Sequence, residues 1–367
     1  MKKWLIKLGL GVALIHTAHW ATAQAKLESV FKENTYQLTG VAVSRGGRIF
    51  VNYPYWSDTY KYALVEVMKD GSTKPYPDAA WNSWKPGQDP TNRWVCVQSE
   101  FIDTKDRLWV IDPASPKQQG VYRDAHKLVC FDLSTNKVIR QYSFKNIVGP
   151  DSYLNDIRVD TQREVVYVTE SKNGGIAVID INSGKITMKL QGDKSVKSDP
   201  TYKFVIDGRE LRDDKGPVKF NSDGLALTPE GNMLYYKALT DNKLYRIPTA
   251  ALRNAGLSDA DLKAKVEDLG AYTTTDGMII DRAGNLYLGD IQNYELYSLQ
   301  TSGNPKPPLK RTNLVKDTAL LQWPDSYAIH DGYLYVTTSQ IDHMAKHNGG
   351  KDSRKRPYEV LRVKIGK

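Results

Sequence analysis

A repeated pattern of two alternating strands joined by a tight turn constrains this chain more than any other feature. Copies begin at residues 39, 98, 155, 223, 276 and 325, and each alternates apolar and polar residues around a turn that contains Gly or Asp. The clearest copy, DGLALTPEGNMLYY from residue 223, is followed by a third strand at residues 243–247. Such self-similarity indicates a repeat architecture and must be recognised before any domain boundary is drawn.

Each copy supplies most of one antiparallel sheet. Third strands are expected at residues 63–68, 127–133, 176–181, 243–247, 295–299 and 359–364. Fourth strands are weaker, and the clearest lie at residues 138–144 and 185–190. Because no Pro- and Gly-rich linker separates the copies, the pattern predicts an all-β fold, a six-bladed β-propeller formed as one domain by residues 24–367. Residues 26–38 are a candidate for an added strand that completes a blade.

One insertion has helical periodicity. Ser258 is a suitable N-cap, Leu262, Val266 and Leu269 would share one face, and Gly270 would end the helix. The sequence therefore predicts a small helical insertion at residues 258–270, packed on the rim of the propeller.

The N-terminus has the layout of a secretory signal peptide. Lys2, Lys3 and Lys7 precede an apolar run at residues 8–15, and the small residues Ala21-Thr22-Ala23 follow. The apolar run is too short to span a bilayer. We expect residues 1–23 to be removed, which gives a secreted protein that is periplasmic in a Gram-negative bacterium. A retained membrane anchor is the alternative.

Composition excludes several classes of function. The formal charge of +9 would fall to +6 without the three lysines of the signal peptide, and the remaining excess is spread along the chain. No basic patch suited to nucleic acid is apparent. We expect a monomer with no membrane contact after cleavage. Cys96 and Cys130 lie in apolar strand contexts with a strand between them, which favours two buried free thiols.

Alignment of the copies predicts a polar ring at one mouth of the central channel. The first residue of each innermost strand would contribute to it: Thr39, Gln98, Asn155, Asp223, Asp276 and Asp325. Converging carboxylates repel one another unless a cation, a ligand amine or raised carboxyl pKa values relieve the repulsion. The alternative is structural, because Asp before Gly also serves turn formation by accepting backbone N–H bonds.

Aromatic residues are expected in the loops above this ring. Tyr53, Trp56 and Tyr294 could line a pocket for an aromatic or cationic ligand, although each could instead cap the edge of a blade. His343 and His347 are four residues apart, as metal-binding pairs on a helix are, but their Gly- and Lys-rich surroundings favour a solvated loop.

Several ordered segments resemble the Yellow / major royal jelly protein family. They include GRIFVNYPYW from residue 47, KLVCFDLSTNKVIRQYSF from residue 127, VYVTESKNGGIAVID from residue 166 and SDGLALTPEGNMLYYKALTDNKLYRIPT from residue 222. The similarity extends over residues 38–365. It implies a secreted six-bladed propeller with a small-molecule pocket at the mouth of its channel. Some members bind amines or related aromatic ligands, and some are linked to dopachrome conversion.

The family is similar in architecture to gluconolactonase-like propellers, which hold a divalent metal with Glu, Asn and Asp. By that resemblance Asn155, Asp223 and Asp276 would bind a cation such as Ca²⁺, with Asp223 as the catalytic proton acceptor. Thr39 stands where a Glu would be expected, and Glu100 or water would have to supply the missing oxygen. A small-molecule binder, a metal-dependent lactonase-type hydrolase or dopachrome-type isomerase, and a protein-interaction platform therefore remain open.

Overall fold

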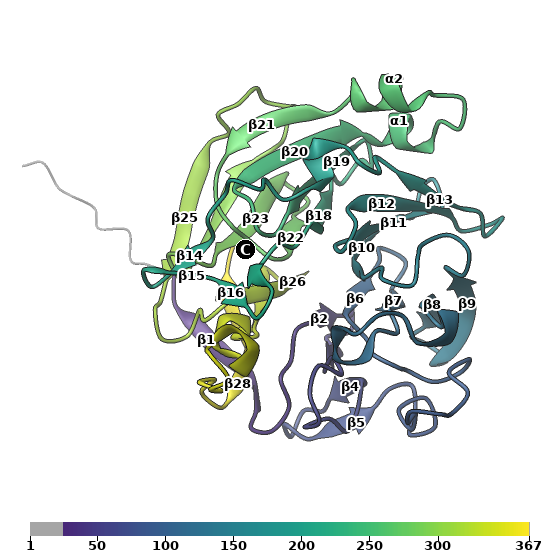
Figure 1. Cartoon of the computed structure of the whole chain (residues 1–367), viewed down its shortest axis with the longest axis vertical. Coiled ribbons are helices and arrows are strands. Elements are labelled where there is room, and N and C mark those ends of the chain that lie inside the picture. The colour runs from purple at the N-terminus through teal and green to yellow at the C-terminus, as the bar shows by residue number, and fades with distance from the viewer. Residues whose placement is uncertain (1–24, 367) are drawn as a thin grey trace, which may run out of the picture.

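Six four-stranded antiparallel sheets surround one central channel in the computed structural model, which describes residues 25–366. The innermost strands of neighbouring sheets contact one another around a closed ring, in the order β2, β6, β10, β18, β22 and β26 (Figure 1). This confirms the predicted six-bladed β-propeller. The predicted signal peptide lies outside the described residues.

The first three blades follow the chain from the innermost strand outwards. Their strands are β2 (Val41–Val43), β3 (Ile49–Asn52), β4 (Leu64–Val67) and β5 (Thr73–Pro75); β6 (Ser99–Ile102), β7 (Arg107–Asp112), β8 (Lys127–Asp132) and β9 (Lys137–Ser143); and β10 (Leu154–Asp160), β11 (Val165–Glu170), β12 (Gly175–Asp180) and β13 (Ile186–Lys189).

The last three blades are built in the same way, except that the final blade takes its outer strand from the N-terminus. Their strands are β18 (Ser222–Leu227), β19 (Met233–Ala238), β20 (Lys243–Pro248) and β21 (Glu267–Ala271); β22 (Met278–Ile280), β23 (Asn285–Asp290), β24 (Glu295–Gln300) and β25 (Arg311–Lys316); and β26 (Pro324–His330), β27 (Tyr333–Thr338), β28 (Tyr358–Lys364) and β1 (Leu27–Glu33).

Short elements occupy the connections between these strands. The small hairpins are β14 (Val205–Ile206) with β15 (Arg209–Glu210) and β16 (Arg212–Asp213) with β17 (Gly216–Pro217). The helices are α1 (Thr249–Arg253) and α2 (Asp259–Lys263), and the 3₁₀ turns are η1 (Pro116–Gln118), η2 (Tyr122–Asp124), η3 (Lys194–Val196), η4 (Ile341–His343) and η5 (Ala345–His347). In residues 25–366, no helix has the length and apolar character needed to span a membrane.

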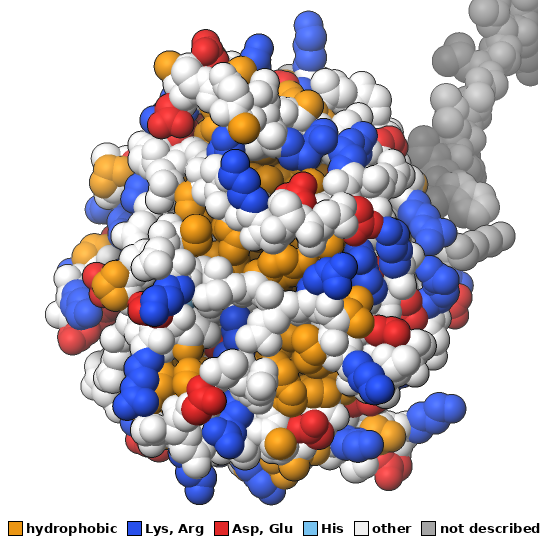
Figure 2. All heavy atoms as spheres, turned by 90° about the vertical axis from the view of Figure 1, so that its right-hand side faces the viewer, with side chains coloured by type: hydrophobic (Ala, Val, Ile, Leu, Met, Phe, Trp, Pro, Cys, Tyr) orange, Lys and Arg blue, Asp and Glu red, His pale blue; other side chains and the backbone are white. Residues whose placement is uncertain are grey.

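Apolar clusters between neighbouring blades form the core. Both faces of the middle strands are buried, which explains why strands such as β8 and β11 are apolar along most of their length. Cys96 and Cys130 are buried and free, as predicted. On the face drawn in Figure 2, basic side chains are scattered among acidic and apolar ones.

The predicted helix at residues 258–270 was wrong in its second half. Helix α2 ends at Lys263, and residues 267–271 form β21, the fourth strand of its blade. The outer edge of strand β20 needs a hydrogen-bonding partner strand, and β21 supplies it, with Arg246 opposite Glu267. The side chains of these two residues also form an ion pair at 2.6 Å. Leu269 therefore packs in the next inter-blade cluster, while Leu262 packs in the preceding one.

The N-terminal segment closes the ring, as the sequence suggested. Strand β1 pairs antiparallel with β28, from Leu27 opposite Val363 to Glu33 opposite Tyr358. Phe31 is buried in a cluster that includes Val360 of the last blade and Val41 of the first. One strand therefore completes the last sheet and also joins it to the first.

We expect Phe31→Ala to lower the free energy of unfolding by about 3–5 kcal/mol, because it leaves a cavity between the first and last blades. Denaturant unfolding followed by circular dichroism measures this loss. Lys32→Ala, at the exposed neighbouring position of the same strand, is the control and should change stability by about 0.5 kcal/mol or less. Equal stability of the two variants would contradict a closing role for β1.

Candidate functional site

Four of the six predicted ring residues, from four successive blades, lie together, and three of them form one hydrogen-bonded series. The Gln98 Nε2 atom donates to Asn155 Oδ1 at 3.2 Å, and Asn155 Nδ2 donates to Asp223 Oδ2 at 2.8 Å. The carboxyl of Asp276 lies close enough to that of Asp223 for the two to repel each other, which raises the pKa of Asp223. All four side chains are buried. Their contacts come from the packing of adjacent blades, since each residue lies in a separate repeat.

A cavity of about 470 Å³ opens directly onto this series. Its floor includes Gln98, Asn155, Asp223 and Asp276, so the ring residues face the cavity. A volume of this size is suited to a small molecule. The propeller therefore presents an enclosed acidic floor at one end of its channel.

Aromatic side chains line the walls and bond to the floor. Trp56 Nε1 donates to the Tyr153 hydroxyl at 2.7 Å, and that hydroxyl donates to Gln98 Oε1 at 2.7 Å. On the opposite side, Trp323 Nε1 donates to Asp276 Oδ2 at 2.7 Å. These bonds fix the orientation of the polar groups and of the rings, so the cavity is preorganised.

Three loops cover the cavity. They are the segment of η1, the segment of β16 and β17, and the segment of η4 and η5; the lining residues they contribute include Gln118, Pro217, Val218, Ile341, Lys346 and His347. Such loops vary independently of the blades that hold the floor. The blades therefore set the acidic floor, and the loops set the shape of the cavity and add charged side chains such as Lys346 to its walls.

Burial determines the protonation of the two floor carboxyls. It raises the pKa of Asp223 well above its ordinary value, and repulsion from Asp276 raises it further. Burial also raises the pKa of Asp276, to about 7, although the bond from Trp323 opposes this effect. Asp223 Oδ1 is buried and has no partner among the described residues. Without a ligand, the pair retains a proton that exposed acids would lose.

Lys237 is a buried cation close to these acids. Its Nζ atom donates to the carbonyl oxygens of Ala238 at 2.6 Å and of Asp241 at 2.8 Å. Burial lowers its pKa to about 8, while Asp241, Asp223 and Asp276 act in the opposite direction. Its charge offsets part of the repulsion on the floor. Sequence reasoning missed this residue, because it lies within a strand that reads as an ordinary apolar run.

More acids lie beneath the floor. Both carboxyl oxygens of Glu100 are buried without a partner in the described chain, and burial followed by repulsion from Asp156 raises the Glu100 pKa well above its ordinary value. A Cβ atom at Gly40 would lie 2.5 Å from Glu100 Oε2, so only glycine allows this close approach. Glu100 therefore faces the channel, but it does not line the cavity.

The predicted metal site does not fit the present arrangement of donors. Asn155 turns its amide N–H towards Asp223, and its oxygen already accepts from Gln98. Within residues 25–366, no group of three or more His, Cys, Asp or Glu side chains could hold a metal ion. A divalent cation such as Ca²⁺ at Asn155, Asp223 and Asp276 stays a prediction, and it would require the retained proton to leave and the amide to turn.

Two other predicted ring residues lie in the channel but do not line the cavity. Thr39 Oγ1 accepts from Asn52 Nδ2 at 3.1 Å. Asp325 is buried with Oδ2 unpartnered by any described group, and burial followed by repulsion from Asp276 raises its pKa. Both residues therefore influence the site through packing and charge and have no direct contact with the cavity.

The structure does not place two of the predicted aromatic residues at the cavity. The Tyr53 hydroxyl donates to Glu33 Oε2 at 3.0 Å within the cluster that closes the ring. The Tyr294 hydroxyl donates to Asp207 Oδ2 at 2.7 Å within the cluster between the last two blades. Both side chains serve packing, since their strand-end positions direct them between blades. Trp56 alone of the three predicted aromatic residues lines the cavity.

The prediction that His347 lies in a solvated loop was wrong. Its ring is buried, lines the cavity and contacts the carbonyl oxygen of Arg212 through Nδ1 at 3.1 Å. Burial lowers its pKa to about 4, so the imidazole is neutral at physiological pH. Packing of η5 against β16, which are distant in sequence, buries a segment whose composition is typical of an exposed loop.

Tyr153 and Trp323 are the wall residues that sequence reasoning missed. Each stands two positions before a predicted ring residue, Asn155 and Asp325 respectively. For Tyr153 this offset was a usable signal, because side chains two apart along an extended chain point to the same side. For Trp323 it was not, because the φ angle of +60° at Trp323 departs from an extended chain. Phe220, which also lines the cavity, carries no such signal.

Fold and site together define the class of protein: a closed six-bladed propeller with a buried acidic cavity, lined by aromatic residues, at one end of its channel. The family described as "Major royal jelly protein" matches residues 95–365, which is well over half of the chain. This chain belongs to the major royal jelly protein family. The resemblance found in the sequence is confirmed.

Relatives in the family are similar at low identity. Major royal jelly protein 7 of Apis mellifera is 25% identical over 235 residues, which cover 60% of this chain and 49% of that protein. Yellow-related salivary protein SP04 of Phlebotomus argentipes is 24% identical over 252 residues, which cover 64% of this chain and 60% of that protein. The chain spans about half the length of the curated relatives it matches.

A solved gluconolactonase from Xanthomonas campestris has the same architecture. It superimposes with a TM-score of 0.53 at 11% identity, over 93% of this chain and 89% of that one. At this identity the likeness shows the fold alone.

The raised pKa of Asp276 makes stability depend on pH. Because the folded pKa is about 7 and the ordinary value is 3.8, the folded state holds the extra proton between those limits. The stabilisation is complete below about pH 4 and is lost as the pH rises towards 7, by up to ~1.4 kcal/mol per pH unit. Denaturant unfolding from pH 4 to pH 7 should therefore show a smaller decline for Asp276→Asn than for the unmodified protein.

The control for this measurement is Glu230→Gln, which removes an exposed carboxylate far from the cavity. It should decline with pH as the unmodified protein does. A decline in Asp276→Asn equal to that of both reference proteins would contradict the assignment of the retained proton to this pair.

Proposed function

We propose that this protein is a secreted, monomeric propeller that binds a small amine with an aromatic group in the acidic cavity. The observation that carries the proposal is the unpartnered Oδ1 of Asp223, buried in the floor of a 470 Å³ cavity with aromatic walls. A buried acceptor without a donor is costly, so a ligand that donates to it gains that free energy on binding.

The charge of the floor selects the head group of the ligand. Asp223 and Asp276 retain a proton when the cavity is empty, and a ligand ammonium would replace that proton as the positive partner. Exchange of a proton for a ligand cation leaves the net charge of the floor unchanged. An anionic head group placed against the floor would add to the existing repulsion, so the amine is the group that we place there.

The walls select the rest of the ligand. Trp56, Tyr153 and Trp323 surround the floor, and Phe220 lies in the covering loop. Aromatic rings accept other rings by stacking or edge contacts and attract cations over their faces. An arylalkylamine carries both a cation and a ring, so it offers one group to the floor and one to the walls.

Secretion belongs to the same proposal. It rests on the signal-peptide pattern of residues 1–23 and on the names of the relatives, which refer to royal jelly and saliva. In a Gram-negative bacterium the same signal would deliver the protein to the periplasm. We propose that it has no nucleic-acid partner and, once the signal is cleaved, no membrane contact.

An enzyme that uses the same cavity is the second candidate. The observation that favours it is the pKa of Asp276 near 7, which suits a group that gains and loses protons near neutral pH. In a dopachrome-type isomerase, the Asp223–Asp276 pair would accept a proton from one carbon and return a proton to another atom of the substrate. A lactonase-type hydrolase would also need the divalent cation whose site requires rearrangement.

Tyramine is a suitable binding probe. We expect saturable binding by isothermal titration calorimetry, at least about tenfold weaker in Asp223→Asn, because a charge-assisted hydrogen bond is lost. Affinity should rise from pH 5.5 to pH 7.5 as the floor ionises. The analogue 3-(4-hydroxyphenyl)propanoate, which has a carboxylate in place of the amine, should not bind. Glu230→Gln should bind tyramine normally, and equal binding by Asp223→Asn would contradict the proposal.

Turnover separates the binder from the enzyme. If the second candidate holds, the protein will consume dopachrome, or glucono-1,5-lactone in the presence of Ca²⁺, and Asp223→Asn will lower kcat by about 10²–10⁴. Loss of lactone hydrolysis on chelation would identify the hydrolase. Absorbance assays of both substrates that show no rate above the buffer would eliminate the enzyme and leave the binding proposal intact.

A further inference from the structure

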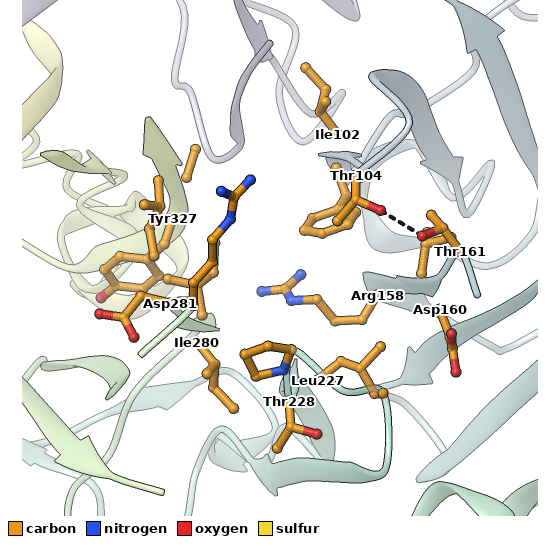
Figure 3. Close-up of a pocket in the computed structure, with 18 of the residues that line it drawn as sticks. Ile102, Thr104, Arg158, Asp160, Thr161, Leu227, Thr228, Ile280, Asp281 and Tyr327 are labelled. Atoms are coloured by element: carbon orange, nitrogen blue, oxygen red, sulfur yellow. Dashed lines mark hydrogen bonds between the residues drawn. The ribbon is translucent and has the colours of Figure 1, made fainter. Parts of the chain in front are cut away.

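The opposite end of the channel holds a second cavity, of about 550 Å³ (Figure 3). It is formed by the last residues of the innermost strands, whereas the acidic cavity is formed by the first. Its apolar lining includes Val43, Phe101, Ile102, Leu227, Ile280 and Ile329. The two cavities are therefore distinct, and they differ in chemistry.

Arg158 supplies a buried positive charge to this second cavity. It lies on β10, and its guanidinium points into the middle of the pocket in Figure 3. The side chain reaches across the channel to donate to the carbonyl oxygen of Met278, and it also donates to that of Ile157. Its Nε atom is buried and has no acceptor among the described residues. The guanidinium lies 5.0 Å from the ring of Phe101, which holds it in place.

The two carboxylates beside the cavity already accept hydrogen bonds from the turns in which they lie. Asp160 pairs with Arg163 at 2.9 Å and also accepts backbone N–H bonds. Asp281 accepts from the backbone of Ala283, from Asn285 and from the Tyr287 hydroxyl at 2.8–2.9 Å. Neither acid forms an ion pair with Arg158. The two nearby threonines, Thr104 and Thr161, bond to each other (Figure 3).

Asp156 lies on the side of the channel that faces the acidic floor. Its charge attracts the guanidinium of Arg158 and opposes the loss of a proton from it. Asp156 accepts from Ser99 at 3.2 Å, and burial raises its pKa, an effect that Arg158 partly opposes. Burial in turn lowers the pKa of Arg158. Arg282 adds a second, exposed guanidinium to the lining and makes no hydrogen bond or ion pair with a described residue. The charged groups of the cavity that no acid in its lining pairs with are therefore the two guanidiniums.

We propose that this end of the channel is a second ligand site, which binds a small apolar molecule that carries one carboxylate. The carboxylate accepts from the guanidinium of Arg158, with Arg282 as a second cation at the rim. The hydrocarbon part packs against the apolar strand ends. The planar guanidinium presents N–H donors in a geometry that matches the two oxygens of a carboxylate. A charge-assisted hydrogen bond in an apolar cavity is also stronger than one at the surface.

Hexanoate tests the proposal, with 1-hexanol as the uncharged comparison. In isothermal titration calorimetry, hexanoate should bind at least about tenfold more tightly than 1-hexanol. Arg158→Met, which keeps the stem against Phe101 and removes the charge, should abolish that preference. Arg282→Gln changes an exposed side chain and should weaken hexanoate binding severalfold, so the test holds even if Arg158→Met does not fold.

Arg140→Gln is the matched control, since Arg140 is exposed on an outer strand and bonds only to the carbonyl oxygen of its neighbour Ile139. It should bind hexanoate as the unmodified protein does. Equal affinity for hexanoate and 1-hexanol, or unchanged hexanoate affinity in the folded Arg282→Gln and Arg158→Met proteins, would overturn the proposal. Tyramine binding at the acidic end should be the same in Arg282→Gln, which shows whether the two sites are separate.

Discussion

The pairing of β1 with β28 holds the ring closed, and the geometry of both cavities depends on that closure. In an open arc of blades, side chains from the first and last repeats would face solvent. With the ring closed, Thr337 of the last blade donates a hydrogen bond to the carbonyl oxygen of Thr39 at the start of the first, although 298 positions separate them. The apolar cluster that contains Phe31, Val41 and Val360 supplies the free energy for closure, since it removes apolar area from water at the last junction.

Closure brings together acids that would repel one another if all were ionised. The fold accommodates them in three ways: Asp223 and Asp276 retain a proton, Trp323 donates to Asp276, and Lys237 provides a buried positive charge nearby. None of these fully satisfies the floor, because Asp223 Oδ1 lacks a donor among the described residues. An empty cavity of this kind is arranged to receive a cation in place of a proton, which connects the electrostatics of the channel to the proposed ligand.

The innermost strand β10 gives the channel its polarity. Within four residues it carries the amide of Asn155, the carboxyl of Asp156 and the guanidinium of Arg158. Because an innermost strand runs along the channel axis, these groups lie at successive depths. The negative groups therefore gather at one end and the positive group faces the other. A single chain could accept two ligands of opposite charge without either one approaching the repulsive end.

The sequence alone determined the fold, through the repeat of alternating strands, and it located the ring residues Gln98, Asn155, Asp223 and Asp276 by alignment of the repeats. Those predictions succeeded because strand periodicity and turn chemistry are local properties. Tertiary structure decided that Tyr53 and Tyr294 pack between blades, that His347 enters the cavity, and that residues 267–271 form a strand despite their helical spacing. Each of these outcomes depends on contacts between distant segments, and local sequence does not encode which partner will cover a given side chain.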